Sequence, residues 1–247
     1  MMKILVCNDD GINAEGIKLL ANWAKKLGEV TVSAPKVQQS AKSHAINIHE
    51  GPIEVRQVPY LDGVTAYEVG STPVDCVRFA TLGLNAHYDL ILSGVNRGFN
   101  MGEDILYSGT AANVFEASLR GCKGIAFSTD PTSFDEAEKW LDKIYDYFVK
   151  NDLFALNDIY NVNIPLNAKE IKWTKQGGAY FTDEFIKIGE GQYSQEGYSI
   201  YKHGTDFTLD TDAVMNGYVS VTPLSTRRDN ATVYEKLAKK ILPKKAK

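Results

Sequence analysis

Cysteine is scarce in this chain of 247 residues, and its spacing does not suggest pairing. The three cysteines, Cys7, Cys76 and Cys122, are odd in number and far apart, and no CxxC pair occurs. This set is typical of reduced thiols and argues against a disulfide framework or a sulfur-rich zinc site. Cys7 ends an apolar run and is interpreted as a core residue rather than a nucleophile.

Long hydrophobic runs are also missing. The N-terminus reads Met-Met-Lys followed by only four apolar residues, too few for a signal peptide or a membrane span. We therefore expect a cytoplasmic protein with no membrane partner.

Positive charge is in slight deficit, with 27 Lys and Arg against 31 Asp and Glu and a formal net charge of −4. We therefore expect no broad surface for nucleic-acid binding. The basic run at residues 236–247 is a local exception, interpreted as a solvated helix face with a frayed end.

Several catalytic and nucleotide-binding motifs are absent. No GxGxxG follows a strand, and neither GxxxxGK[ST], GxSxG nor HExxH occurs, which argues against dinucleotide folds, P-loops, nucleophile elbows and zincins. The four histidines are scattered, and His44 alone is not expected to be a metal ligand.

The first half of the chain alternates short apolar runs with helical spacing. The runs predict buried parallel strands, and the intervening segments predict helices that cover the sheet. This rhythm indicates a Rossmann-like, doubly wound, mostly parallel sheet. The expected strands are residues 4–7, 30–34, 66–69, 89–93 and 124–128, and the expected helices are 17–27, 73–84, 110–119 and 134–149.

The pattern changes after about residue 165. Residues 173–203 are rich in Gly, Tyr, Thr and Lys and alternate weakly, which favours projecting hairpins. A late strand at 218–221 and a C-terminal helix at 231–242 complete the expectation. We predict a catalytic core at 1–165 and a smaller lobe at 166–247 that contains the hairpin, the returning strand and the helix.

Two adjacent carboxylates follow the first predicted strand, in Asn8-Asp9-Asp10-Gly11. Asp9 and Asp10 repel each other unless a cation lies between them, and Gly11 allows a sharp turn. The segment alone fits a turn with an N-cap aspartate equally well.

A second polar segment follows residues 89–93 and reads Ser93-Gly94-Val95-Asn96-Arg97-Gly98. Parallel strands bring their carboxyl ends to one edge, where ligands bind at the switch point. Asn96 offers an amide oxygen there, and Ser40 and Ser43 in the loop after the second strand offer hydroxyls. Carboxylate, amide and hydroxyl oxygens suit Mg²⁺ or Mn²⁺ better than zinc.

The segment Tyr107-Ser108-Gly109-Thr110 begins the predicted helix at 110–119. Free N–H groups and two hydroxyls at a helix start favour an oxyanion. A plain Ser or Thr N-cap is the alternative interpretation.

Six segments in the same order resemble the SurE family of survival proteins, which are metal-dependent nucleoside monophosphate phosphatases. They are residues 4–11, 34–43, 70–77, 89–110, 162–165 and 217–224. The family typically has Gly after the loop serine, whereas this chain has Ala41 followed by Lys42.

The resemblance implies one divalent cation, Mg²⁺ or Mn²⁺, held by Asp9, Asp10, Ser40 and Asn96. It implies that Ser108, Gly109 and Thr110 receive the phosphate, with Asn96 near both groups. It also implies homodimers or homotetramers in which the hairpin and the C-terminal helix are exchanged.

The resulting hypothesis is 5′-nucleotidase activity by a metal-activated water, with Asp9 or Asp10 taking its proton. Cleavage of 3′-monophosphates or short polyphosphate is left open by the sequence. The alternatives from other classes are a noncatalytic nucleotide or metal sensor and a receiver-like signalling domain.

Overall fold

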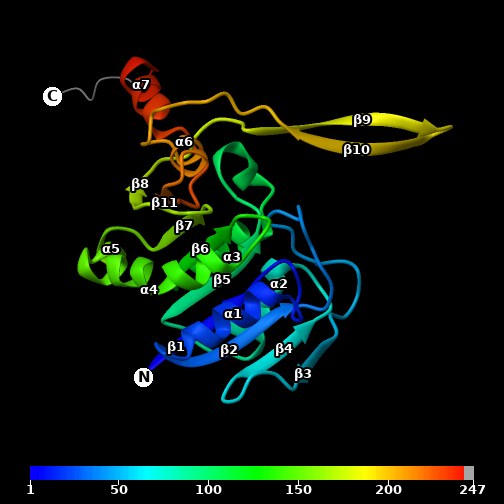
Figure 1. The fold of residues 1–247 in the computed structure, drawn as a ribbon. Coiled ribbons are helices and arrows are strands. Elements are labelled where there is room, and N and C mark those ends of the chain that lie inside the picture. The colour runs from blue at the N-terminus through cyan, green and yellow to red at the C-terminus, as the bar shows by residue number, and fades with distance from the viewer. Residues whose placement is uncertain (242–247) are drawn as a thin grey trace.

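A single large sheet organises the computed structural model, which describes residues 1–241 (Figure 1). The sheet has nine strands in the order β3-β4-β2-β1-β5-β6-β7-β11-β8. Every pairing from β4 to β7 is parallel, whereas β3 and β11 pair antiparallel with β4 and β7. The predicted doubly wound, mostly parallel fold is confirmed. The strands of this sheet are β1 (Met2–Cys7), β2 (Gly28–Pro35), β3 (Val55–Val58), β4 (Thr65–Val69), β5 (Leu90–Arg97), β6 (Lys123–Thr129), β7 (Ile159–Ile164), β8 (Ile171–Trp173) and β11 (Val219–Pro223).

Helices cover both faces of this sheet because consecutive strand residues point to opposite sides. Ile4 and Val6 of β1 belong to the larger buried cluster, together with residues of α1 and α4, while Leu5 and Cys7 belong to a second cluster with residues of α2 and α3. The bounds are α1 (Glu15–Ala24), α2 (Pro73–Arg78), α3 (Gly109–Leu119), α4 (Asp135–Lys150), α5 (Leu153–Leu156), α6 (Asp210–Met215) and α7 (Ala231–Ile241). A π-helical turn follows α2 at Phe79–Gly83, and a 3₁₀ turn precedes α3 at Gly102–Leu106.

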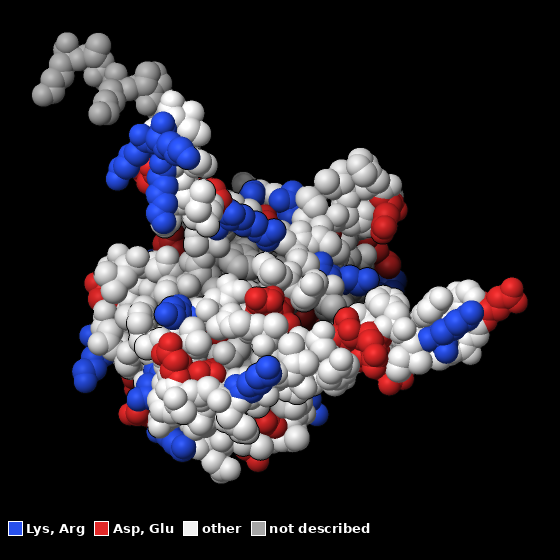
Figure 2. Space-filling model, turned by 90° about the horizontal axis from the view of Figure 1, so that it is seen from above, with Lys and Arg blue, Asp and Glu red and all other residues white. Residues whose placement is uncertain are grey.

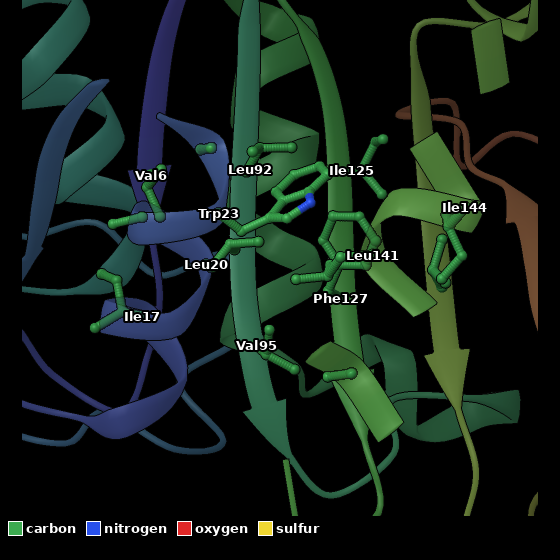
Figure 3. Packing of buried hydrophobic residues seen from close by; sticks show 14 of the residues in the cluster. Val6, Ile17, Leu20, Trp23, Leu92, Val95, Ile125, Phe127, Leu141 and Ile144 are labelled. Atoms are coloured by element: carbon green, nitrogen blue, oxygen red, sulfur yellow. The ribbon is translucent and has the colours of Figure 1, made fainter. Parts of the chain in front are cut away.

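The larger cluster packs α1 and α4 onto the sheet (Figure 3). Ile17, Leu20 and Trp23 recur at helical spacing on the buried face of α1, and Leu141 and Ile144 do the same on α4. Trp23 meets Phe127 of β6 edge to face, with ring centroids 6.4 Å apart. This packing holds β1, β5 and β6 in one rigid layer.

The hairpin of β9 (Phe181–Gly189) and β10 (Gln192–Ser199) stands away from the body (Figures 1 and 2). It confirms the hairpin predicted within residues 173–203. Its outer part exposes apolar side chains, among them Phe185, Ile188 and Tyr193, which are 70%, 66% and 56% exposed.

Several element bounds differ from the expectation. The helix predicted at 73–84 is an α-helix to Arg78 and then a π-helical turn, and the strand predicted at 89–93 runs on to Arg97. The edge strand β3, the short strand β8, and α5 and α6 were not predicted. The helix predicted to residue 242 is found to Ile241, and residue 242 lies outside the described part of the chain.

The strand β7 shows why a buried strand escapes a search for apolar runs. All six of its residues are buried, but Asn161 and Asn163 interrupt the hydrophobic pattern. Their side-chain Nδ2 groups donate to the main-chain oxygen of Asn100, at 2.6 and 3.0 Å. Buried amides are tolerated here because they fix the loop after β5.

We expect Phe127→Ala to lower the free energy of unfolding by about 3–5 kcal/mol, since it opens a cavity in a fully buried cluster. Chemical denaturation at fixed protein concentration measures the change. Val149→Ala, at a side chain that is 64% exposed, is the matched control and should change stability by less than about 0.5 kcal/mol. Equal losses in the two variants would contradict the assignment of this core.

Candidate metal and phosphate site

The switch point of the sheet lies between β1 and β5. From β1 the chain runs outward through β2 and β4 on one side, and from β5 through β6 and β7 on the other. The two strands are parallel neighbours, with Cys7 opposite Ser93. Their carboxyl ends therefore place Asp9 and Asp10 beside Asn96, at the position where open α/β sheets bind ligands.

The first acidic residue, Asp9, is 5% exposed and lies against the start of α3. Its Oδ1 accepts a hydrogen bond from the Thr110 hydroxyl at 2.6 Å. Burial raises the pKa of Asp9 to about 6, although the Thr110 hydroxyl lowers it, and the neighbouring Asp10 raises it further. A cation at this carboxylate would relieve the cost of its burial.

The second acidic residue, Asp10, faces the end of β5. Burial raises the pKa of Asp10 above its usual value, although the positive charge of Arg97 lowers it. The Arg97 guanidinium is paired with Glu15 at 3.1 Å and lies 4.6 Å from the centre of the Phe134 ring. Arg97 is thus tethered at the rim of the cleft.

The loop after β2 that carries Ser40, here called the Ser40 loop, forms hydrogen bonds with both aspartates. The Gln39 N–H donates to the main-chain oxygen of Asp9 at 2.7 Å. The Gln38 Nε2 atom bridges Asp10 Oδ1 and Ser40 Oγ, at 3.4 and 2.9 Å. The sequence does not predict this role of Gln38, because a glutamine two residues before a serine is not part of a recognisable site motif.

The loop also explains the family difference at Ala41. Ala41 and Ser43 both have positive φ angles, +58° and +53°, in the left-handed region that glycine adopts most easily. A glycine would adopt this backbone without strain, whereas this chain adopts it with an alanine.

The amide of Asn96 is oriented by its own strand end. Its Nδ2 donates to the Gly98 oxygen at 2.7 Å, which leaves Oδ1 free to accept or to bind a cation. The pairing of β5 with β6 shifts register between Ser93 and Asn96, and this shift aims Asn96 at the cleft.

The sequence allowed two roles for the hydroxyl residues at the start of α3, a helix N-cap and a binding site for an oxyanion. The structure is compatible with both. Ser108 is the N-cap, and its Oγ accepts the Ala111 N–H at 3.0 Å, so its own proton remains available to a ligand. Thr110, fully buried, is instead directed at Asp9. Gly109 lets the Asp9 carboxylate lie directly on the helix start, because a Cβ there would be 2.9 Å from Asp9 Oδ2.

A cleft of about 710 Å³ joins these groups. It is lined by all four predicted metal ligands and by Ser108, whereas Gly109 and Thr110 are buried and do not line it. The opposite wall comes from the loop after β5 and from the base of the hairpin, which the sequence did not assign to the site. Its members include Asn100, Glu103, Asp104, Tyr107, Phe181 and Asp183.

The donor set fits a hard divalent cation. Two carboxylates, a hydroxyl and an amide oxygen converge on the cleft. Among residues 1–241 no group of three or more His, Cys, Asp or Glu side chains is placed to hold a metal ion. A cation at this site would therefore need the oxygens of Ser40 and Asn96 as well as the two aspartates.

The cysteines lie apart from this site. All three are free and buried, and burial raises the pKa of each thiol. They are core residues, as predicted for Cys7.

Fold and site together define a Rossmann-like α/β protein with a hard-oxygen site at its switch point. A family model described as survival protein SurE matches residues 4–183. The chain belongs to the SurE family, as the sequence motifs indicated.

Relatives support this membership along most of the chain. The 5′-nucleotidase SurE of Clostridium botulinum (strain 657) is 38% identical over 251 residues, which cover 95% of this chain and 97% of that protein. The 5′-nucleotidase SurE of Clostridium beijerinckii is 36% identical over 240 residues, covering 90% and 92%. The crystal structure of the SurE protein from Aquifex aeolicus superposes with a TM-score of 0.80 at 32% identity, covering 96% and 98%.

We expect Gly109→Ala to weaken Mn²⁺ binding by about 10- to 100-fold, because the new Cβ would displace the Asp9 carboxylate. Calorimetric titration of the metal-free protein measures the affinity. Gly178→Ala is the control, since a Cβ at that position meets nothing within 4 Å. Unchanged affinity in Gly109→Ala would show that Asp9 does not bind the metal from this position.

Proposed function

We propose that this protein is a metal-dependent 5′-nucleotidase that hydrolyses nucleoside monophosphates. The convergence of Asp9, Asp10, Ser40 and Asn96 on one cleft is the observation that carries the proposal. The named activity of the relatives from two Clostridium species agrees with it. Release of phosphate from 3′-monophosphates or short polyphosphate would show whether the same cleft also hydrolyses these substrates.

Asp9, Asp10, Ser40 and Asn96 would hold one Mg²⁺ or Mn²⁺ ion. When bound, the cation lowers the pKa of a water molecule and neutralises charge that develops on the phosphate oxygens. The chain prepares this site before binding. Thr110 fixes Asp9, and Gln38 fixes Asp10 and Ser40.

The phosphate lies at the start of α3. The Ser108 hydroxyl donates to a phosphate oxygen while its Oγ still caps the helix, and the N–H of Gly109 is one of the unpaired groups of the first turn. Asn96 borders both the metal ligands and this phosphate position. Thr110 contributes by holding Asp9, since its hydroxyl already donates there.

The proton of the attacking water passes to Asp9 or Asp10. Both carboxylates line the cleft, where either can take the proton of a water molecule. Thr110 occupies Asp9 Oδ1, so Oδ2 is the oxygen of Asp9 left for the transfer.

The nucleoside lies against the hairpin side of the cleft. Tyr107 and Phe181 line it and are 64% and 43% exposed, so their rings can cover a base. The cleft volume of about 710 Å³ is within the usual range for small-molecule sites.

The lobe at residues 166–247 serves oligomerisation. The hairpin exposes Phe185 and Ile188, and α7 exposes Tyr234 and Leu237, at 64% and 47%. Exposed apolar surfaces on projecting elements favour exchange between copies, as homodimers or homotetramers.

A cytoplasmic location agrees with the three unpaired cysteines. Within residues 1–241, no helix has both the length and the apolar composition needed for a membrane span.

The assay that tests this proposal is release of inorganic phosphate from a panel of nucleoside 5′- and 3′-monophosphates with Mn²⁺, with Mg²⁺ and with EDTA. We expect turnover that requires metal, and a loss of at least about 10³-fold in kcat/KM for Asp9→Asn. Asp62→Asn, at an exposed carboxylate far from the cleft, is the matched control. Metal binding with no phosphate release would favour the sensor alternative, and full activity in Asp9→Asn would refute the assigned site.

Thr110→Val tests whether Thr110 acts through Asp9. It removes the hydroxyl donor but keeps the shape, so the apparent Mn²⁺ affinity should fall by about 10-fold. Thr110→Ser should restore it. If Thr110→Val raised only the KM for nucleotide, Thr110 would contact substrate rather than position Asp9.

A further inference from the structure

A second cavity, here called the basic pocket, lies beside the cleft. Its volume is about 330 Å³, and it shares only Leu106 and Ser108 with the cleft as lining residues. Its remaining walls come from the loop after β2, the 3₁₀ turn before α3, α3 itself, the segment just after β8, and β11 with the residues that follow it. The basic pocket is thus a separate space behind the segment that carries the phosphate position.

The charge in the basic pocket is of one sign. Lys175, Arg227 and Arg228 line it, and within residues 1–241 no Asp or Glu does. None of the three makes an ion pair with the described part of the chain, and Asp206 influences Lys175 only from a distance. All three residues are exposed at the mouth of one cavity, and in a protein of net charge −4 such a group of cations without ion-pair partners in residues 1–241 favours an anion.

The histidine of the basic pocket belongs to its framework. His44 Nε2 lies 3.0 Å from Glu116 Oε2, and the Glu116 carboxylate also contacts Arg78 and Arg120, at 3.2 and 3.1 Å. The Glu116 carboxylate is therefore buried and already paired with three cationic side chains. It leaves the charges of Lys175, Arg227 and Arg228 uncompensated.

The uncharged residues that line the basic pocket indicate what kind of anion would bind there. Ser225 and Gln176 add polar donors, and Ile105, Phe115 and Leu224 form an apolar wall. Arginine forks match phosphate oxygens in pairs, so a dianionic phosphate suits this set better than a single carboxylate. The apolar wall has room for a small organic group attached to it.

The basic pocket also touches the segments that shape the active cleft. Ser43 lines the pocket, and it donates through N–H to the Tyr107 oxygen at 3.0 Å and through Oγ to the Leu106 oxygen at 2.7 Å. These bonds join the Ser40 loop to the segment before Ser108. An occupant would therefore contact the reverse side of both.

We propose that the basic pocket is a second anion site, distinct from the cleft, that binds a phosphate dianion, either free or carried on a small organic molecule. Lys175, Arg227 and Arg228 supply the charge. The site requires no turnover and does not depend on the proposed nucleotidase activity.

Equilibrium dialysis with radiolabelled inorganic phosphate tests the site. Phosphate binding at the basic pocket is separated from binding in the cleft by measuring the Asp9→Asn protein as well as the unsubstituted protein, each in Mg²⁺ and in EDTA. We expect R227Q/R228Q to weaken binding at the pocket by at least about tenfold in both backgrounds. Phosphate release from a nucleoside monophosphate by R227Q/R228Q with intact Asp9 should stay within about twofold, since neither arginine lines the cleft.

K18Q/K25Q is the matched control, because it removes two exposed charges from the α1 region and lowers the net charge equally. It should leave phosphate binding unchanged. Unchanged binding in R227Q/R228Q, or equal loss in both double variants, would overturn the proposal. Loss of nucleotidase activity in Asp9→Asn with pocket binding retained separates the two proposals.

Two non-hydrolysable competitors identify the source of the phosphate. In the Asp9→Asn protein, phenylphosphonate should displace the label at a concentration at least about fivefold lower than methylphosphonate, if the apolar wall holds an organic group. Equal displacement by the two would assign the same site to free phosphate. Failure of either compound to displace the label would overturn the proposal.

Discussion

The burial of the Asp9 carboxylate on the first turn of α3 is the constraint on which the site depends. A charge at that depth is costly unless donors or a cation face it. The chain supplies the donors from Thr110, which is 101 residues away in sequence. This contact joins the end of β1 to the start of α3, and it brings the proposed metal position and the proposed phosphate position next to each other.

The rest of the architecture serves that contact. The switch between β1 and β5 brings two strand ends together, and the core of α1 and α4 keeps the strands rigid. Loops then add what strands cannot, namely the Ser40 hydroxyl and the wall from the base of the hairpin. Preorganised donors on rigid elements are what electrostatic catalysis requires.

The fold could be predicted from local signals wherever one residue type dominates a segment. The apolar runs of β1 and β5 and the helical spacing of α1 and α4 are of this kind. The strand β7 escaped because Asn161 and Asn163 are buried polar residues whose partner, Asn100, lies 61 and 63 residues away. At the site, residue types and strand ends indicated Asp9, Asp10 and Asn96. They could not reveal that Ser108 caps the helix while Thr110 faces Asp9, or that Phe181 closes the cleft, because those relations exist only after the chain has folded.

The left-handed backbone at Ala41 and Ser43 makes the Ser40 loop easier to open than the sheet beneath it. Two non-glycine residues in this conformation cost about 1–2 kcal/mol each, and the loop is held in it by contacts with Asp9, Leu106 and Tyr107. Such a segment belongs to the low-stability end of local opening that native-state hydrogen exchange detects. Since the same loop carries Ser40, its opening would release a proposed metal ligand while the sheet remains intact. Exchange at the Gln39 and Ser43 amides would then report on occupancy of the cleft, because a bound cation would slow them together.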